Sequence, residues 1–272
     1  LEIKTRTSVA AYHGYNFLLA RENLTDHLNK NEKKGKIRQR LLKIRAKKVI
    51  IATGALERPM IFNNNDRPGI MLSSAVKKYA NYYGVISGKK TVFFTNNDSA
   101  YESAISLNKK GINVEAIIDI REKSNSKIVK ETIDLGIKIY WSHTVVDTDG
   151  YKRLKEISIM ELSKDNQSVV GTKKNISCDC LGIAGGWTPA VHLFTQSGGK
   201  LKFNEEDQVF LPNEHPSEQV SIGSCNGDFE LDKIIKNLST SLKDFLKIEK
   251  TDYDNLNVEC SSDVSKKNIW LL

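Results

Sequence analysis

The run Val49–Ala55, with the sequence Val-Ile-Ile-Ala-Thr-Gly-Ala, constrains the fold of this chain more than any other segment. Its β-branched apolar residues predict a buried strand, and Gly54 after it lets the backbone turn with almost no side chain in the way. In open α/β sheets, ligands bind beyond the carboxyl ends of such strands. The sequence therefore predicts that Ala52, Thr53 and Gly54 lie against a nucleotide. A tight strand-to-turn glycine with no ligand is the alternative.

A strand, a helix and a second strand follow in the middle of the chain. The residues predict a buried strand at Thr91–Phe94, a helix over 99–110 and a second strand at Val114–Ile118. This order is typical of a βαβ unit, so we expect a parallel sheet.

The turn of this βαβ unit lacks glycine. Thr95 and Asn97 occupy the glycine positions, whereas Ala100 and the strand-end Asp119 are as a dinucleotide site would have them. Without glycine the backbone cannot approach a pyrophosphate as closely. We expect that this unit has lost its nucleotide and that Asp119 is a satisfied strand-end carboxylate, paired with Arg121.

Further elements are expected on both sides of this unit. Ser73 or Ser74 is predicted to cap a helix over 73–83, which Gly84 ends. The other expected elements are strands at 36–44 and 48–53, a helix at 127–135, strand-like runs at 137–141, 154–161 and 169–176 that complete a small domain with an antiparallel flap, strands at 180–184 and 219–222, a helix from Pro189 through Phe194 and a helix at 228–247.

The segment Gly185–Pro189 predicts an anion-binding helix start. Thr188 suits the N-cap and Pro189 the first turn of a helix whose positive end would point at whatever Gly186 approaches. Trp187 is either a packing residue or a ring stacked on a cofactor. Arg58 can pair with a phosphate, with surface solvation as an equal alternative.

A second loop, 223–227, precedes the last helix. Gly223 and Ser224 stand where a Gly-Asp pair would hold a ribose hydroxyl, and Ser224 can hydrogen-bond but carries no charge. Asn226 and Gly227 are expected to present backbone N–H groups to a pyrophosphate.

Charge and composition favour a cytoplasmic protein without nucleic-acid or membrane partners. The formal net charge is +8, and much of it lies in 30–48, a segment without the aromatic residues that nucleic-acid binding would use. We expect an exposed hairpin there. No apolar run approaches the roughly 20 residues needed to cross a bilayer. The cysteines, which are Cys178, Cys180, Cys225 and Cys260, have poor metal-ligand spacing and are expected to be free thiols. No catalytic residue and no metal site are predicted.

Four segments occur in order along the chain: Ala52–Pro59 (ATGALERP), Asn64–Met71 (NNDRPGIM), Phe94–Tyr101 (FTNNDSAY) and Gly186–Leu193 (GWTPAVHL). With these segments the chain resembles the alpha subunits of heterotetrameric sarcosine oxidases, from about residue 6 to about residue 231. The glycine-less turn of the third segment is the specific part.

This resemblance implies an α/β, Rossmann-like FAD/NAD(P)-binding fold with two dinucleotide domains, as in pyridine nucleotide-disulfide oxidoreductases, incomplete at the N-terminus. It implies an oxidoreductase complex acting on CH–NH donors, in which sarcosine becomes glycine, a one-carbon unit passes to tetrahydrofolate or leaves as formaldehyde, and oxygen becomes hydrogen peroxide. NAD would belong to the intact subunit, FMN to its interface with the beta subunit, FAD to the beta subunit and tetrahydrofolate to a further C-terminal domain. The implied partners are the beta, gamma and delta subunits. The resemblance further implies that the polar turn 95–98 is free to face the beta subunit or the FMN.

The family resemblance also implies domain limits. We expect a partial FAD/NAD(P)-binding domain at 1–87, an inserted degenerate Rossmann-like domain at 88–174, a return to the first domain at 175–248, and a linker at 249–272 towards an aminomethyltransferase-like folate domain. Such a piece, without its first phosphate loop, is expected to be inactive alone. The alternatives are an alpha-type subunit of hydrogen cyanide synthase or of a proline or opine dehydrogenase, or a non-catalytic assembly module.

Overall fold

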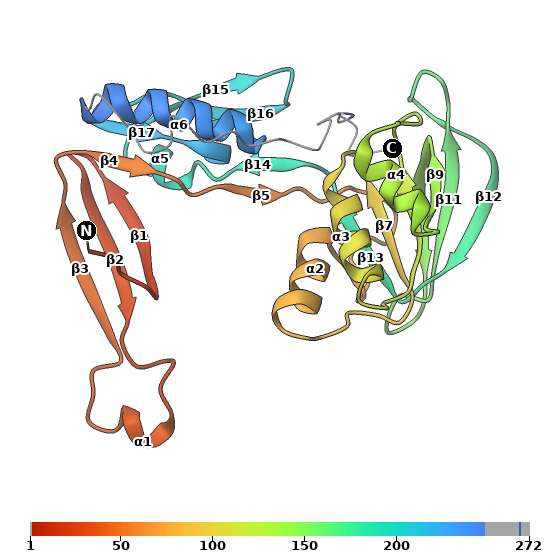
Figure 1. The fold of residues 1–272 in the computed structure, drawn as a ribbon, viewed down its shortest axis with the longest axis horizontal. Helices are drawn as coiled ribbons and strands as arrows, with labels where there is room; N and C mark the ends of the chain where they lie inside the picture. The colour runs from red at the N-terminus through yellow and green to blue at the C-terminus, as the bar shows by residue number, and fades with distance from the viewer. Residues whose placement is uncertain (1, 248–266, 268–272) are drawn as a thin grey trace. The chain divides into compact units, whose positions relative to one another are not determined.

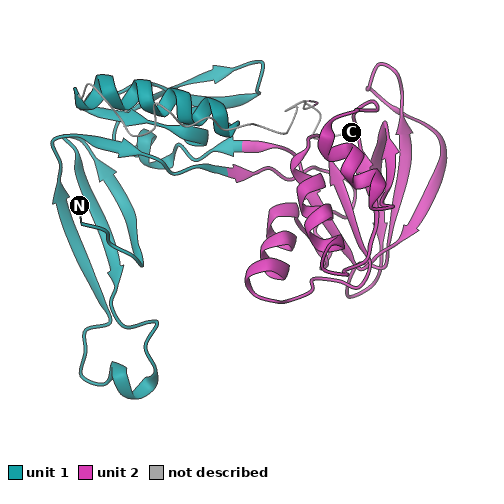
Figure 2. Cartoon of the chain, in the orientation of Figure 1, with its two compact units in different colours: residues 1–55, 188–258 teal, residues 56–187, 259–272 magenta. Residues whose placement is uncertain are grey.

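A computed structural model of the chain describes residues 2–247 and residue 267 (Figure 1). The chain divides into two compact units, residues 1–55 with 188–258 as unit 1 and residues 56–187 with 259–272 as unit 2 (Figure 2). Among the described residues, none of the helices is long and apolar enough to cross a membrane. Apart from Lys267, the segment predicted as a linker, 249–272, lies outside the described residues.

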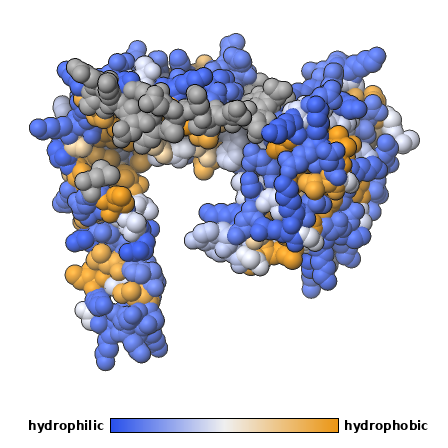
Figure 3. Space-filling model, viewed as in Figure 1, coloured by the Kyte–Doolittle hydropathy of each residue, from blue (hydrophilic) through white to orange (hydrophobic). Residues whose placement is uncertain are grey.

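Unit 1 begins with an antiparallel sheet of three strands, β1 (Thr7–His13), β2 (Phe17–Asn23) and β3 (Gln39–Arg45), with β2 in the centre. The short helix α1 (Lys30–Lys33) lies in the connection from β2 to β3. Only the third strand was expected from the sequence, as part of a hairpin. Figure 3 shows hydrophobic side chains among hydrophilic ones on this sheet, in accord with the exposure of Val9, Leu41 and Ile44.

Acidic side chains of unit 1 pair with the basic segment 30–48. Arg40 Nη2 lies 2.7 Å from Glu22 Oε2 across the β2–β3 pair, and Arg38 Nε lies 2.8 Å from Asp26 Oδ1. Within 30–48 the sequence has a single acid, Glu32, whereas these two partners come from the preceding strand and its connection. Part of the local positive charge is therefore balanced within the sheet.

The rest of unit 1 is built around a pair of parallel strands, β4 (Val49–Ile51) and β17 (Gln219–Ser221). Tyr12, Val49, Ile51, Phe194 and Cys225 form its buried core. The other elements are helix α5 (His192–Gln196), the antiparallel hairpin of β15 (Lys200–Asn204) and β16 (Val209–Glu214), the 3₁₀ turn η1 (Gly223–Asn226) and helix α6 (Leu231–Leu246).

Strands β5 (Ala55–Glu57) and β14 (Trp187–Pro189) pair with each other, and the limits of the two units fall inside them. The prediction of a helix from Pro189 is therefore wrong, since this residue ends a strand and α5 begins at His192. The N-cap of α5 is Val191, so Thr188 is not its cap. The strand pairing has overridden the local helix-start signal of Thr188 and Pro189.

Unit 2 contains a parallel sheet of five strands in the order β6-β13-β7-β8-β9. The βαβ prediction is confirmed, because β7 (Thr91–Thr95), α3 (Ser99–Asn108) and β8 (Val114–Asp119) follow one another and the two strands are parallel. The remaining strands are β6 (Ile70–Leu72), β9 (Lys138–Trp141) and β13 (Cys180–Ala184).

Three helices and a second sheet cover the two faces of this parallel sheet (Figure 1). Helices α2 (Ser73–Tyr82), α3 and α4 (Lys127–Asp134) pack on one face, where Phe93, Tyr101 and Val129 are buried. On the other face, Phe94 and Ile118 pack against Ile157 and Ile159 of the flap.

The flap is an antiparallel sheet of β10 (His143–Asp149), β11 (Glu156–Leu162) and β12 (Val169–Ser177). The expected run at 137–141 is instead the parallel strand β9, which pairs with β8. Strand β10 was not predicted. Ser142 adopts φ 51°, a left-handed conformation that separates the two strands where the sequence has no glycine or proline.

The start of α2 differs from the prediction, although its extent agrees with it. Its N-cap is Leu72, whose side chain makes no capping hydrogen bond. Glu57 takes this role, because its Oε2 accepts hydrogen bonds from the Ser74 backbone N–H at 2.8 Å and from the Ser74 hydroxyl at 2.6 Å. Gly84 has φ 67° just beyond the helix end, as a glycine stop requires.

Candidate functional site

The carboxyl ends of β4 and β17 lie at the same edge of unit 1. The strands are parallel, with Val49 opposite Gln219 and Ile51 opposite Ser221. The Ile222 N–H continues this pairing with a 2.9 Å hydrogen bond to the Ile51 carbonyl. The segments Ala52–Gly54 and Gly223–Ser224, which follow the two strands directly, therefore leave the sheet side by side.

Two glycines in the left-handed conformation shape this edge. Gly54 has φ 72° and Gly223 has φ 71°. A Cβ built on Gly54 would meet only Ser224 Oγ, at 4.0 Å, so the space beside the Gly54 backbone is open. Ala52 and Thr53 are exposed at the same edge. The arrangement lets a ligand come up to backbone atoms without displacing a side chain.

Hydrogen bonds to Ala190 hold the Thr53–Gly54 turn in place. The Thr53 hydroxyl donates to the Ala190 carbonyl at 2.8 Å, and the Ala190 N–H donates to the Gly54 carbonyl at 2.9 Å. Beneath the edge, the buried Cys225 thiol donates to the Ile222 carbonyl at 3.1 Å. The structure thus brings together Thr53, Gly54 and Ser224 on a fixed backbone.

The end of the 223–227 loop is organised by its own backbone. The Gly227 N–H donates to the Ser224 carbonyl at 3.3 Å, and the Asp228 N–H donates to the Gly223 carbonyl at 3.3 Å. A Cβ on Gly227 would lie 2.8 Å from the Leu211 side chain, so this glycine is needed for packing. Asn226 is exposed at the end of η1, and α6 begins only at Leu231.

Asp228 is a candidate residue that the sequence reasoning missed. It is half-buried beside the Gly223 turn, and its Oδ1 accepts a 2.7 Å hydrogen bond from Asn237 Nδ2. Burial raises the pKa of its carboxyl group above the ordinary value. Ser224 cannot supply a carboxylate after the strand end, and Asp228 places one four residues later. The sequence signal for this residue was an acidic side chain only four positions after Ser224, where an aspartate was expected.

Arg58, Gly186 and Trp187 form a second local group, within unit 2. The Arg58 N–H donates to the Gly186 carbonyl at 2.8 Å, and the Gly185 N–H donates to the Arg58 carbonyl at 2.7 Å. Gly186 is buried with φ 94°, and Trp187 is half-buried. Burial lowers the pKa of the Arg58 guanidinium. These hydrogen bonds fix the Arg58 backbone directly after β5.

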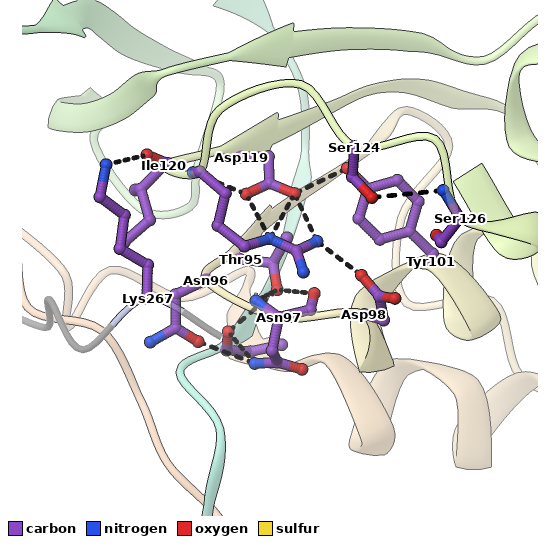
Figure 4. Close-up of polar contacts among 12 residues, drawn as sticks. Thr95, Asn96, Asn97, Asp98, Tyr101, Asp119, Ile120, Ser124, Ser126 and Lys267 are labelled. Carbon is purple, nitrogen blue, oxygen red and sulfur yellow. Dashed lines mark hydrogen bonds and ion pairs between the residues drawn. The ribbon is translucent and has the colours of Figure 1, made fainter. Parts of the chain in front are cut away.

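The equivalent strand-end turn of unit 2 is closed by its own side chains (Figure 4). Asn96, Asn97 and Asp98 are all buried. Asn97 Oδ1 accepts from the Ser99 N–H at 2.9 Å, and Asn97 Nδ2 donates to the Ala184 carbonyl at 3.1 Å. The expectation that this turn is free to face a partner is wrong, because its amide side chains cap α3 and bridge to β13.

A buried ion-pair cluster lies directly beside this turn (Figure 4). Arg121 Nη2 lies 2.7 Å from Asp98 Oδ1 and 2.8 Å from Asp119 Oδ2, which confirms the predicted Asp119–Arg121 pair. The Tyr101 hydroxyl donates to Asp119 Oδ2 at 2.7 Å. Burial and the neighbouring Asp119 carboxylate raise the pKa of Tyr101, so it stays a hydrogen-bond donor.

Lys267 completes the closure of the unit 2 edge (Figure 4). Its backbone N–H donates to the Asn96 carbonyl at 3.0 Å. Its ammonium group donates to the Ile120 carbonyl at 3.1 Å and to Asn166 Oδ1 at 2.6 Å. A pyrophosphate at this edge would have to displace these bonds and the Arg121 cluster, so these residues do not fit a dinucleotide.

Comparison with known proteins gives a family and several relatives. Residues 10–221 match the sequence profile of the family described as pyridine nucleotide-disulphide oxidoreductase. The sarcosine oxidase subunit alpha of Corynebacterium sp. (strain P-1) is 37% identical over 227 residues, which are 83% of this chain and 23% of that protein. The subunit of the same name from Rhizobium meliloti (strain 1021) is 31% identical over 217 residues, 78% of this chain and 20% of that protein.

Solved structures agree with this result at the level of the fold. The T. acidophilum thioredoxin reductase matches with a TM-score of 0.56 and 19% identity over 82% of this chain and 67% of that chain. The L-proline dehydrogenase from P. horikoshii matches with a TM-score of 0.55 and 20% identity over 90% of this chain and 42% of that chain. The predicted fold class and the resemblance to sarcosine oxidase alpha subunits are both confirmed, and the chain spans about a quarter of those relatives.

Proposed function

Because the chain belongs to the pyridine nucleotide-disulphide oxidoreductase family, we propose that the β4–β17 edge of unit 1 binds NAD. The observation that carries the proposal is Gly54 with φ 72°, at the carboxyl end of a parallel strand and with open space towards Ser224. Ligands of α/β sheets bind in this position.

The residues at this edge fit a dinucleotide. Ala52, Thr53 and Gly54 would contact the ligand through their backbone. Gly223 would let the backbone after β17 approach the ligand closely as well, and Ser224 would hydrogen-bond a ribose hydroxyl. Asp228 is a second candidate partner for that hydroxyl, and burial raises the pKa of its carboxyl group. NAD, when bound, supplies a hydride acceptor. The residues of this chain bind and orient it.

Thr188, Asn226 and Gly227 are proposed as further cofactor contacts of unit 1, and Arg58, Gly186 and Trp187 as cofactor contacts within unit 2. For Arg58 the support is its desolvated guanidinium on a backbone fixed by Gly186. The Gly227 N–H donates to the Ser224 carbonyl, so the expectation that this N–H is free for a pyrophosphate is wrong, and a contact there would require that bond to open.

We further propose that the chain is part of the alpha subunit of an oxidoreductase complex that acts on CH–NH donors. Sarcosine is the proposed substrate, with glycine, a one-carbon unit and hydrogen peroxide as products. Beta, gamma and delta subunits are the proposed partners. FMN at the beta-subunit interface, FAD in the beta subunit and tetrahydrofolate on a further domain are the proposed additional cofactors. The support is 37% and 31% identity to two proteins named sarcosine oxidase subunit alpha.

The domain limits at 87, 174 and 248 remain a prediction, as does the cytoplasmic location. We propose that the βαβ region within 88–174 serves as scaffold or subunit contact. The closed edge formed by Asn97, Arg121 and Lys267 supports that role.

The test of the NAD site is a Gly54→Val variant of the full polypeptide that contains these residues. The new side chain would occupy the open space towards Ser224, so we expect NAD affinity to fall at least tenfold in calorimetric titration. Gly84→Val is the matched control, because Gly84 has φ 67° and open surroundings in unit 2 and carries the same backbone penalty. Equal NAD affinity in the two variants would refute the proposed site. Sarcosine-dependent peroxide formation by the assembled complex tests the substrate separately.

A further inference from the structure

A cavity of about 530 Å³ lies at the other edge of the unit 2 sheet. Its walls come from the residues just before β7, from those just before β11, and from the connection between β12 and β13. They are Lys89, Lys90, Arg153, Leu154, Lys155, Ser177, Cys178 and Asp179. The cavity therefore opens at the amino ends of β7 and β13, opposite the strand ends that carry Thr95 and Asp119.

The cavity is strongly cationic. Four of its lining side chains are basic and one is acidic. The acid, Asp179, is already engaged, since its Oδ1 accepts from the Lys90 backbone N–H at 2.8 Å and its Oδ2 lies 3.9 Å from Arg153 Nη2. Among the described residues, no ion pair involves the ammonium groups of Lys89, Lys90 or Lys155. The cavity thus keeps unbalanced positive charge.

The wall around Asp179 is tightly packed. A Cβ on Gly88 would lie 2.6 Å from Asp179 Oδ1 and 2.6 Å from Cys180 Cβ. Gly88 therefore allows the chain to pass close enough for the Lys90 N–H to reach the carboxylate. Burial opposes the charge of Asp179, but the backbone N–H groups of Lys90 and Lys89 outweigh it and lower its pKa. The carboxylate stays ionised and holds the backbone of Lys89 and Lys90 in place.

The accessible apolar surface of the cavity comes from the methylene chains of its exposed basic side chains. Leu154 is fully buried and Cys178 is 1% exposed, so these two residues lie behind the wall, where a ligand does not reach them. Burial raises the pKa of the Cys178 thiol to about 12, so no thiolate offsets the positive charge. A site with cationic side-chain ends and apolar methylene chains fits an anionic group attached to an organic body.

We propose that this cavity binds a small organic phosphate, with the charged groups of Lys89, Lys90, Arg153 and Lys155 around the phosphate and their methylene chains against the organic part. A volume of about 530 Å³ exceeds what a bare phosphate ion fills. It lies within the roughly 300–1,000 Å³ typical of small-molecule sites. This inference is independent of the proposed NAD site, which lies in unit 1.

The experiment compares three probes on the full polypeptide: inorganic phosphate, pyrophosphate and phenyl phosphate. Calorimetric titration is expected to show saturable binding, with phenyl phosphate at least threefold tighter than inorganic phosphate because its ring packs on the methylene chains of the basic side chains. The variant Lys89→Gln/Arg153→Gln/Lys155→Gln should weaken phenyl phosphate binding at least tenfold. The matched control, Lys110→Gln/Lys123→Gln/Lys130→Gln, removes the same charge from exposed positions of unit 2 and should bind as the unmodified protein does.

Amine footprinting gives a measurement that needs no variant. Phenyl phosphate should protect Lys89, Lys90 and Lys155 from acylation and leave Lys110 and Lys123 unprotected. Inorganic phosphate binding as tightly as phenyl phosphate would overturn the organic part of the proposal. No saturable binding, or equal weakening in the two triple variants, would overturn the site itself.

Discussion

At the scale of single residues, Glu57 is the clearest case of a side chain whose role the sequence conceals. It lies in a segment that we interpreted as part of a nucleotide crossing, and the structure uses it to cap α2 through Ser74. Its other oxygen, Oε1, is buried without a hydrogen-bond partner among the described residues. Burial raises the pKa of this carboxyl group, and the two bonds from Ser74 only partly oppose that effect.

This environment predicts a pH-dependent effect of Glu57→Gln. A carboxyl group with a raised folded-state pKa contributes stability below its ordinary value of 4.5, and that contribution is lost as the pH rises through the folded-state pKa. Gln keeps an oxygen for Ser74 and does not ionise. We therefore expect the free energy of unfolding of the variant, relative to the unmodified protein, to increase from pH 4 to pH 8 in urea titrations. Glu122→Gln, at an exposed position, should show no such trend.

Arg121 predicts a large effect on stability at the same scale. Its guanidinium pairs with two buried carboxylates, Asp98 and Asp119, so Arg121→Met would leave both without their cation. Breaking a buried ion pair on one side costs about 3–5 kcal/mol. Urea unfolding of this variant should show a loss of that size, and Lys123→Met, at an exposed position two residues away, should show almost none. A loss below about 1 kcal/mol would contradict the role of the cluster.

At the scale of elements, the buried strands and the helices between them were predictable because apolar runs and their spacing report burial directly. Thr91–Thr95, Val114–Asp119 and α3 agree with the sequence reading for that reason. Strand β1 was missed because its exposed residues break the apolar pattern, and β10 was missed because neither glycine nor proline separates it from β9; β2 was missed as well. The strand at 187–189 was mistaken for a helix start because its pairing with β5 is not visible in local sequence.

The turn 95–98 gives the prediction for this scale. Thr95→Gly/Asn97→Gly would restore the glycines of a nucleotide-binding turn, but it would remove the amide that caps α3 and bridges to Ala184. Two glycines cost about 0.5–1 kcal/mol each, and a lost cap costs about 1 kcal/mol.

We expect the double variant to lose about 2–3 kcal/mol of unfolding free energy, to assemble less well with its partners and to bind NAD as the unmodified protein does. Urea unfolding, size-exclusion chromatography and NAD titration measure the three effects. Two nucleotides bound per unmodified polypeptide, with one of them at this turn, would refute the scaffold role.

At the scale of the whole molecule, the order of strands in unit 2 is the dominant feature. Strand β13 is the last of the five in sequence, yet it lies between β6 and β7. Its position between β6 and β7 was not predictable, because an apolar run such as 180–184 suits a central strand and an edge strand equally well. The candidate site was also predictable only in part, because local sequence identifies strand ends but not tertiary contacts. The strand ends carrying Gly54 and Ser224 followed from the sequence, whereas Asp228 and the closure by Lys267 depend on tertiary contacts.

This order predicts how truncations behave. Residues 56–187 contain all five strands of the sheet, so we expect them to unfold cooperatively in urea when expressed alone. Residues 56–178 lack β13, which would leave β6 without a partner strand and β7 paired with β8 alone, so we expect no cooperative transition. Circular dichroism at increasing urea distinguishes the two pieces. Cooperative unfolding of the shorter piece would show that the sheet does not need β13.

The late position of β13 also has a consequence during protein synthesis. Ribosomes add about 5–20 residues per second, so the 89 residues between Thr95 and Ala184 take roughly 4–18 s to emerge. Throughout that interval the nascent chain has two apolar strands with open hydrogen-bonding edges, β6 and β7, which are ready to pair with a strand of another chain. The time spent in that state, rather than the stability of the finished protein, would then set how strongly its yield in the cell depends on chaperones and on expression rate.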